Sequence, residues 1–134
     1  MSSSASNDLR DAKYISLRSF KKDGQPVDTP VWFAEVEADH LVVFTVGTSY
    51  KVKRIRRNPK VEVARCDVRG KLLGTWHPAT CRPVEKDQEP QRVAQAYDAL
   101  NHKYGMSMRV GTLFAAIAGR TKRRLILEIA LPAS

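Results

Sequence analysis

The sequence predicts a mainly β protein with a few helices, in which the strands form a closed antiparallel sheet. Three runs with strand character follow one another between Tyr14 and Val46, and tight turns join them. Further runs of this kind follow a short helix, which brings the total to about six strands. Many short strands joined by tight turns are typical of closed antiparallel sheets. The length of 134 residues suits one domain with a single core.

The first three predicted strands precede the middle of the chain. Tyr14–Phe20 is the first, and Asp23-Gly24 marks a hairpin because glycine tolerates the positive φ of a tight turn. Val27–Val36 is the second. Its Pro30 indicates an edge position, a bulge, or a place where a ligand meets the backbone. Leu41–Val46 is the third, a nearly continuous apolar run rich in β-branched residues.

A short basic helix is predicted directly after the third strand. Ser49 can cap its start, and Val52 and Ile55 lie three apart on one face. Pro59 ends it, because the residue before a proline is pushed out of the helical conformation. The segment from residue 47 to 63 has no acid before Glu62. Its six basic residues are Lys51, Lys53, Arg54, Arg56, Arg57 and Lys60.

The second half of the chain predicts three more strands and two helices. Val61–Ala64 and Thr75–Val84 are strands, the second one interrupted by a proline. Glu89–Tyr104 is the clearest helix, with a proline in its first turn and a glycine after its end. A second short helix is predicted over Arg109–Ala118. The run "RRLILEIAL", which ends at Leu131, closes the chain as a buried strand.

The chain is predicted to be one domain behind a short tail. Residues 1–10 form a tail that begins with a Ser-rich polar stretch, and residues 11–134 form the domain. The start lacks the basic and apolar regions of a secretory signal, and no apolar run approaches the roughly 20 residues of a membrane-spanning helix. A cytoplasmic protein without membrane contact is therefore expected. Cys66 and Cys81 are expected to be reduced core thiols rather than a disulfide.

The overall charge favours an anionic partner. The formal net charge is +9 and the sequence pI is about 9.9. A nucleic acid, a phosphorylated cofactor and an acidic lipid surface all fit this charge. Nucleic acid is the weaker candidate, because predicted strands flank the basic helix on both sides and aromatic residues make up only 7% of the chain.

The start of the basic helix has the groups that bind a phosphate monoester. Ser49, Tyr50 and Lys51 offer free backbone N–H groups, hydroxyls and an ammonium within one turn, and the helix dipole adds positive potential. Arg54 lies about one turn further along and could reach the same anion. The competing interpretation is a solvated helix face with no ligand.

Signatures of catalysis by the protein itself are missing from the sequence. It contains no nucleophile elbow, no Gly-rich dinucleotide motif and no P-loop. His40, His77 and His102 lie far apart without metal-ligand spacing, so a metal site is not expected. A predicted phosphate site without a protein nucleophile indicates a cofactor that carries the reaction.

The ordered set of these features resembles a known family. The stretch "GQPVDTPVWFAEVEADHLVVFTVGTSYKVKRIRRNPKV" is similar to the core of the pyridoxamine 5′-phosphate oxidase-like, FMN-binding split-barrel superfamily. The resemblance is best from Tyr14 to Val63 and weaker through Pro132. The segments "TPVWF" and "TVGTSYKVKRIRRNP" most resemble the branch that uses the deazaflavin coenzyme F420.

The resemblance implies a six-stranded split β-barrel that forms a homodimer with two cofactor sites at the subunit interface. Ser49, Tyr50 and Lys51 would hold the cofactor phosphate, with Phe44 and Thr45 beside it. The backbone of four residues would pass along the flavin or deazaflavin ring: Thr29, Pro30, Val31 and Trp32.

The sequence also departs from the oxidase that gives the family its name. Thr29 and Ala34 stand where that enzyme has an Arg and a Lys that bind phosphates, so oxidation of vitamin B6 is not expected. The positive charge suits F420, which has a phosphodiester and an acidic oligoglutamate tail, and FMN is the alternative. The expected reaction is hydride transfer from the reduced cofactor to a small unsaturated or quinone-like substrate. A protein of the same fold that only carries a flavin-type or haem-type cofactor is the second hypothesis.

Overall fold

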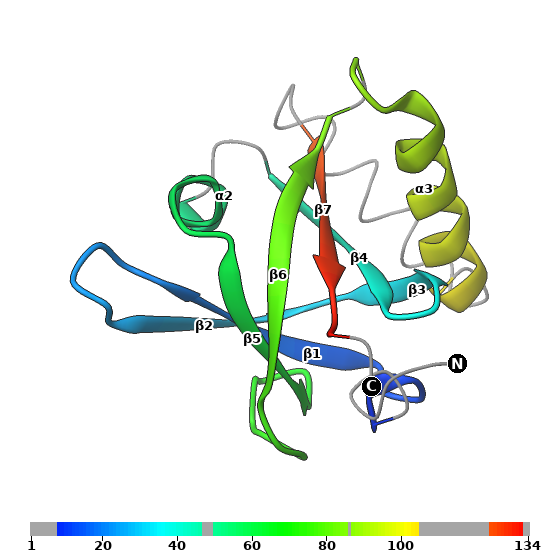
Figure 1. Cartoon of the computed structure of the whole chain (residues 1–134). Coiled ribbons are helices and arrows are strands. Elements are labelled where there is room, and N and C mark those ends of the chain that lie inside the picture. Colours follow the sequence, from blue (N-terminus) through cyan, green and yellow to red (C-terminus); the bar gives the residue numbers. More distant parts are fainter. Residues whose placement is uncertain (1–7, 47–49, 86, 105–123, 133–134) are drawn as a thin grey trace.

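The computed structural model describes residues 8–46, 50–85, 87–104 and 124–132 as one antiparallel sheet with two helices packed on it (Figure 1). The strand order is β2-β1-β5-β6-β7-β4-β3. The elements are β1 (Tyr14–Phe20), β2 (Pro26–Val31), β3 (Phe33–Glu37), β4 (His40–Val46), α2 (Tyr50–Arg57), β5 (Lys60–Cys66), β6 (His77–Val84), α3 (Pro90–Tyr104) and β7 (Arg124–Ala130).

Most predicted elements are confirmed, with one informative exception. The predicted strand Val27–Val36 is wrong as a single strand, because the structure divides it at Trp32. Its first part, β2, pairs with β1, and its second part, β3, pairs with β4. The predicted edge position of Pro30 is confirmed, since β2 pairs on one side only among the described strands. This division accounts for seven strands where about six were predicted.

The sheet curls until its two edge strands meet. β2 and β3 stand at opposite ends of the strand order, yet only Trp32 separates them in the chain. Figure 1 shows β2 running on into β3 behind β5 and β6. No ladder joins β2 to β3 in the part of the chain that the structure describes, so the predicted closure by hydrogen bonds is wrong there. Instead, β2 pairs with β1 and β3 pairs with β4. The barrel is therefore split between these two strand pairs, at the bend where β2 continues into β3.

The core inside the curled sheet is apolar, and α2 covers one end of it. Val52 and Ile55 of α2 are both 1% exposed, which confirms the predicted apolar face of this helix. Ile15 and Leu17 point inward from β1, as the alternation of that strand predicts. The inward residues from the other strands include Val31, Phe33, Leu41, Val43, Val61, Val63, Ala79, Cys81, Leu127 and Ile129.

A second apolar cluster lies outside the curled sheet, under α3. Val93, Ala96 and Leu100 form the buried stripe of this helix. They pack on the outer face of the sheet at Ala34, Val42, Val84 and Ile126. Figure 1 shows α3 beside β3 and β4, away from α2. Trp32 is partly buried against this cluster, so its side chain belongs to the packing under α3.

Turns and cysteines largely follow the sequence predictions. Gly24 has a φ of 88° and Asp39 a φ of 64°, at the two turns that were expected. Pro78, predicted to interrupt the strand Thr75–Val84, instead lies inside β6, opposite Glu62. Cys66 and Cys81 are buried and free, as predicted for core thiols. The predicted helix at residues 109–118 lies outside the described residues.

None of the helices in the described segments is long and apolar enough to cross a membrane.

Candidate functional site

The split in the sheet leaves backbone edges without a neighbouring strand. The ladder between β3 and β4 begins with the pair Phe33 and Val43. β4 continues for three more residues, to Val46, and pairs there with β7 on its other side only. In the described residues, its edge toward β3 is therefore unpaired over residues 44–46. Unpaired backbone N–H and C=O groups of this kind need a partner from solvent or a ligand.

Two predicted site segments lie on the two sides of this split. Continued by one residue, the register of β3 and β4 would place Trp32 opposite Phe44. The chain instead leaves β4 at Trp32, and its preceding residues, Thr29 to Val31, lie in β2. The outer edge of β2 is unpaired in the described residues as well. The structure thus brings Thr29–Trp32 and Phe44–Thr45 to the same opening.

The side chains of the β2 segment turn away from its free edge. Val31 is 7% exposed and points into the core, while Pro30 lies on the outer face beside Gly70. Trp32 packs under α3. A ligand at this edge would therefore meet backbone groups, as the sequence predicts.

The predicted phosphate-binding turn follows the same opening. α2 begins at Tyr50, four residues after the end of β4 at Val46. Its first backbone N–H groups have no partner within the helix, and the helix dipole makes this end positive. Tyr50 and Lys51 lie in this first turn, whereas Ser49 is outside the described residues. Contact of these three residues with an anion stays a prediction.

Arg54 is directed at the sheet. Its Nε donates a 2.9 Å hydrogen bond to Oγ of Ser19 on β1, and Ser19 is only 1% exposed. This bond helps to seat α2 on β1. The predicted contact between Arg54 and a phosphate is not tested by this bond and stays a prediction.

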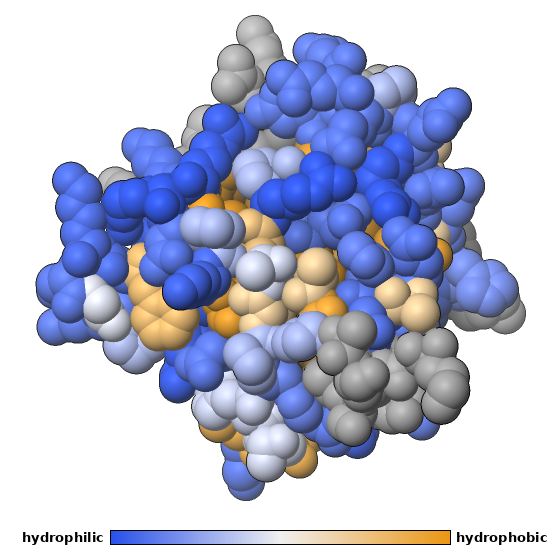
Figure 2. All heavy atoms as spheres, viewed as in Figure 1, coloured by the Kyte–Doolittle hydropathy of each residue, from blue (hydrophilic) through white to orange (hydrophobic). Residues whose placement is uncertain are grey.

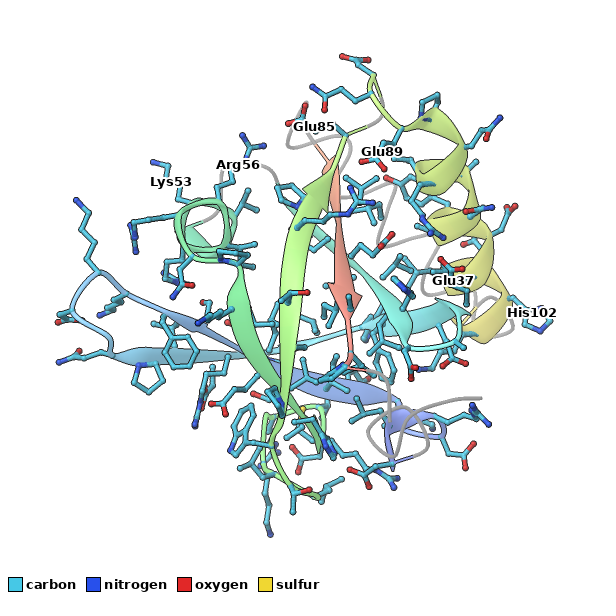
Figure 3. The ribbon with its side chains drawn as sticks, in the orientation of Figure 1. Glu37, Lys53, Arg56, Glu85, Glu89 and His102 are labelled. Atoms are coloured by element: carbon cyan, nitrogen blue, oxygen red, sulfur yellow. The ribbon has the colours of Figure 1, made fainter. Side chains whose placement is uncertain are left out.

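The remaining basic residues of this region differ in their surroundings. Arg56 donates a 2.8 Å hydrogen bond to Glu85, which follows β6 (Figure 3). Lys53, Arg57 and Lys60 are exposed. Figure 3 shows Lys53 and Arg56 extending outward from α2. This helix therefore keeps a positive outer surface.

The histidines of the chain lie away from the split. His40 begins β4, and its Nδ1 is 3.2 Å from Glu128 on β7. His77 meets Asp8 at 2.7 Å, and His102 is exposed on α3 (Figure 3). No group of three or more His, Cys, Asp or Glu side chains that could hold a metal ion occurs in the described ranges.

A buried carboxylate that the sequence did not indicate, Glu128 on β7, contacts the first turns of α3. Glu128 is 6% exposed, and its Oε1 is 2.8 Å from Nε of Arg92 and 3.5 Å from Nη2 of Arg82. Oε1 has no aligned hydrogen-bond donor, so these contacts are ion pairs. Arg92 also forms an ion pair with Glu37 at the end of β3. A lone Glu in an apolar strand was the only available signal.

Burial shifts the pKa values of two side chains, Cys66 and Lys103, in opposite directions. Burial raises the pKa of the Cys66 thiol, and Asp67 adds to the effect, so this thiol is a poor nucleophile at neutral pH. Burial lowers the pKa of Lys103 to about 8, although Asp11 opposes the shift. The Lys103 ammonium lies 3.4 Å from the ring centre of Phe33. Neither residue lies among the predicted cofactor contacts.

Comparison with known families agrees with the split sheet. The family model for pyridoxamine 5′-phosphate oxidase matches residues 5–130. The chain belongs to this family. The fold is consistent with the FMN-binding split barrel that the family shares, with one strand divided in two. No curated protein matches the chain.

Solved structures share the fold of this family member at low sequence identity. A conserved hypothetical protein from Mycobacterium tuberculosis is 20% identical, with a TM-score of 0.65 over 98% of this chain and 81% of that one. A FAD-binding protein from Mesorhizobium loti is 17% identical, with a TM-score of 0.61 over 95% and 84%. The heme storage protein HutZ from Vibrio cholerae is 12% identical, with a TM-score of 0.67 over 100% and 93%. At these identities the likeness concerns the fold alone.

Proposed function

We propose that the chain is an oxidoreductase that binds a flavin-type cofactor at the split of its sheet, with coenzyme F420 as the preferred cofactor. The observation that supports this proposal is the pair of unpaired backbone edges at the split of the sheet, followed along the chain by the positive start of α2. Membership of the pyridoxamine 5′-phosphate oxidase family supports the same assignment.

The donor set at this site fits a flavin-type cofactor. A planar ring with polar edges needs backbone donors and acceptors along one side, and the segments Thr29–Trp32 and Phe44–Thr45 supply them. A phosphate needs several N–H donors and a cation, and the first turn of α2 with Lys51 supplies these. Ser49 and Tyr50 would add hydroxyls.

The charge of the region favours F420 over FMN. FMN has one terminal phosphate, which the start of α2 alone could bind. F420 adds an acidic oligoglutamate tail, and the exposed cations Lys53, Arg57 and Lys60 offer it a complementary surface. The net charge of +9 acts in the same direction.

The residues of the chain act by binding and orientation. When bound in its reduced form, the cofactor supplies a hydride for a small unsaturated or quinone-like substrate. The backbone of Thr29–Trp32 would fix the ring, and the apolar residues around it would exclude water from one side. Lys51 would hold the phosphate. No side chain of the described residues is assigned to proton transfer.

A paired titration with FMN and with F420, followed by cofactor fluorescence, tests the proposal. We expect tight binding of F420 and weak binding of FMN. The reverse preference would make the protein an FMN-binding member of the family and overturn the F420 assignment. Binding of neither cofactor would overturn the proposed function itself.

A cofactor carrier without turnover is the second candidate, because solved structures with this fold include a FAD-binding protein and a heme storage protein. Steady-state oxidation of reduced cofactor by candidate acceptors separates the two candidates. For haem, the split offers no histidine ligand, since the described histidines lie elsewhere. Nucleic-acid binding would show itself by a steep fall of affinity with salt.

A further inference from the structure

The exposed large apolar side chains of the described residues gather on the connection between β5 and β6. They are Val68, Leu72 and Leu73, which are 63%, 43% and 60% exposed. Single apolar residues on a surface are normal, whereas a group of neighbours in solvent marks a contact with a partner or with a membrane. We call residues 67–73 the apolar loop.

The apolar loop projects from one end of the molecule. Figure 1 shows it at the bottom of the view, past the end of β5 and the start of β6, while α2 and α3 lie higher. Figure 2 shows orange atoms at the same lower end. The loop can therefore meet a flat surface before either helix does.

Hydrogen bonds within the apolar loop hold it in a set shape. The backbone N–H of Asp67 donates to the carbonyl of Lys71 at 3.0 Å, and that of Leu73 donates to the carbonyl of Arg65 at 2.8 Å. Oδ1 of Asp67 accepts from the backbone N–H groups of Arg69 and Lys71, both at 2.9 Å. Because the loop is already ordered, little conformational entropy is lost when it docks.

The tip of the apolar loop also packs against β2. Gly70 has a φ of 90°, which glycine adopts without strain. A Cβ placed on Gly70 would lie 3.7 Å from Cδ of Pro30. The turn is thus supported from the side as well as from its own strands.

The apolar loop interleaves its apolar side chains with cations. Arg69 and Lys71 are exposed, and they stand between Val68 and Leu72 in the chain. The carboxylate of Asp67 is bound by the backbone of the loop itself. Arg and Lys side chains can keep their charged ends in a polar layer while apolar neighbours enter the layer below.

We propose that the apolar loop is a peripheral docking site for a membrane surface that contains anionic phospholipid. Val68, Leu72 and Leu73 would enter the boundary between headgroups and acyl chains, and Arg69 and Lys71 would contact headgroup phosphates. Apolar insertion and attraction by anionic lipid act together at such sites. The net charge of +9 adds attraction at longer range.

The composition of the apolar loop favours lipid over a second copy of the chain. Charged residues, lysine above all, are depleted from the cores of protein interfaces, yet Arg69 and Lys71 lie within the apolar group. A protein partner would have to place an acid opposite each of these cations. An anionic lipid surface offers a phosphate to each of them wherever it lies.

This docking needs neither a membrane-spanning helix nor the cofactor. The expectation of a protein without membrane contact came from the lack of a long apolar run and of a secretory signal, and a peripheral loop requires neither. The residues of the apolar loop are not among the predicted cofactor contacts. Docking and cofactor binding are therefore measured separately.

Flotation with vesicles of phosphatidylcholine and phosphatidylglycerol tests the proposal. We expect the wild type to bind these mixed vesicles at least about tenfold more tightly than vesicles of phosphatidylcholine alone. Leu72→Ser with Leu73→Ser should weaken binding to the mixed vesicles at least about tenfold, because the apolar insertion is lost. Urea unfolding checks that this variant is folded. A wild type that does not prefer the mixed vesicles, or a folded variant that binds them as tightly, overturns the proposal.

A matched pair of charge variants tests whether the cations of the loop are the ones in contact. Arg69→Gln with Lys71→Gln and Lys21→Gln with Lys22→Gln each remove two exposed charges, the first pair on the loop and the second in the hairpin between β1 and β2. We expect vesicle binding to weaken about 10–30-fold for the loop pair. For the hairpin pair we expect at most about a twofold change, because distant charges are screened. Equal losses would assign the attraction to net charge and overturn the docking site.

A fluorescent label on the loop tests its insertion with both leucines in place. Val68→Cys takes a polarity-sensitive label, and Lys22→Cys is the control, while the native Cys66 and Cys81 are buried. We expect mixed vesicles to shift the emission of the Val68 label to the blue and to leave the Lys22 label unchanged. An unshifted Val68 label in a protein that binds the vesicles overturns the proposal.

Sedimentation without lipid tests the other occupant, a second copy of the chain. A wild type that binds no vesicles, yet forms a dimer that the Leu72→Ser and Leu73→Ser variant dissociates, would assign the apolar loop to a contact between copies and overturn the lipid proposal.

Discussion

The two described helices are both basic, but their cations have different surroundings. On α3, Arg92 contacts Glu37 and the buried Glu128, so its charge is matched by acids of the protein itself. On α2, Arg56 contacts Glu85, whereas Lys53 and Arg57 lie exposed. A count of basic residues in the sequence does not separate these two situations.

The difference teaches how each helix is attached to the sheet. α3 is held by an apolar stripe and by ion pairs at its first turns, where Arg92 meets Glu128. α2 is held by Val52 and Ile55, together with the bond from Arg54 to Ser19. Apolar contacts and one side-chain hydrogen bond thus attach α2, and Lys53 and Arg57 lie on its exposed surface.

Removing the buried acid under α3 should have the largest effect on stability. Glu128→Ala removes the acid that Arg82 and Arg92 share, while each keeps a second partner, Glu89 or Glu37, and we expect a loss of about 1.5–3 kcal/mol in the free energy of unfolding. Urea unfolding measures this loss. Glu85→Ala is the matched control, because its partner Arg56 is exposed and can be rehydrated. Equal effects of the two substitutions would contradict the contrast between the helices.

Removing a cation at the start of α2 should affect binding rather than folding. For Lys51→Ala we expect cofactor affinity to fall by about 1.5–3 kcal/mol, since one charged hydrogen bond to the phosphate is lost. The fluorescence titration measures it, with unfolding in urea as the check on stability. Lys22→Ala, an exposed cation in the hairpin between β1 and β2, should change neither quantity. An unchanged affinity in the Lys51 variant would refute the phosphate assignment.

Lys103, near the C-terminal end of α3, should make the stability of the protein change with pH in the alkaline range. The pKa of Lys103 is lowered to about 8 by burial, from an ordinary value of 10.5. The unfolded chain therefore holds more protons than the native one between these values, so stability should rise as the pH rises from about 8 toward about 10.5. Lys103→Met should flatten this rise in urea unfolding series. A slope that is the same in both proteins would contradict the assignment.

The exposed ion pair between Arg56 on α2 and Glu85 after β6 should have the smallest effect on stability. Both side chains are well exposed, at 50% for Arg56 and 39% for Glu85. Arg56→Ala is therefore expected to lower the free energy of unfolding by about 0–1 kcal/mol, with less effect at high salt. A loss comparable to that of Glu128→Ala would mean that α2 is also fastened by its charges.

Local pattern was sufficient for most elements of the fold. The alternation of β1, the apolar pair Val52 and Ile55, and the stripe of α3 depend on neighbours in sequence, and the structure confirms them. The hairpin at Gly24 was likewise predicted, because a positive φ is a local requirement. Within the candidate site, the same reasoning predicted where α2 begins and that Pro30 lies at an edge.

Partners that are distant in sequence could not be predicted in this way. The bend at Trp32 arises because β2 and β3 pair with different strands, a choice that no local pattern of residues 27–36 contains. Glu128 lies in a run that was predicted only as a buried strand, and the sequence did not show that Arg92 and Arg82 would reach it from α3 and β6.

The sequence by itself determined the kinds of elements, their order, the excess of positive charge and the place where the basic helix begins. These follow from periodicity, turn chemistry and composition, which act over a few residues. Only the tertiary structure decided that the predicted strand divides at Trp32 and that Arg92 on α3 pairs with the buried Glu128 on β7. These depend on strand pairing and side-chain packing between segments far apart in the chain, where burial and charge are set by neighbours that no short window of sequence contains.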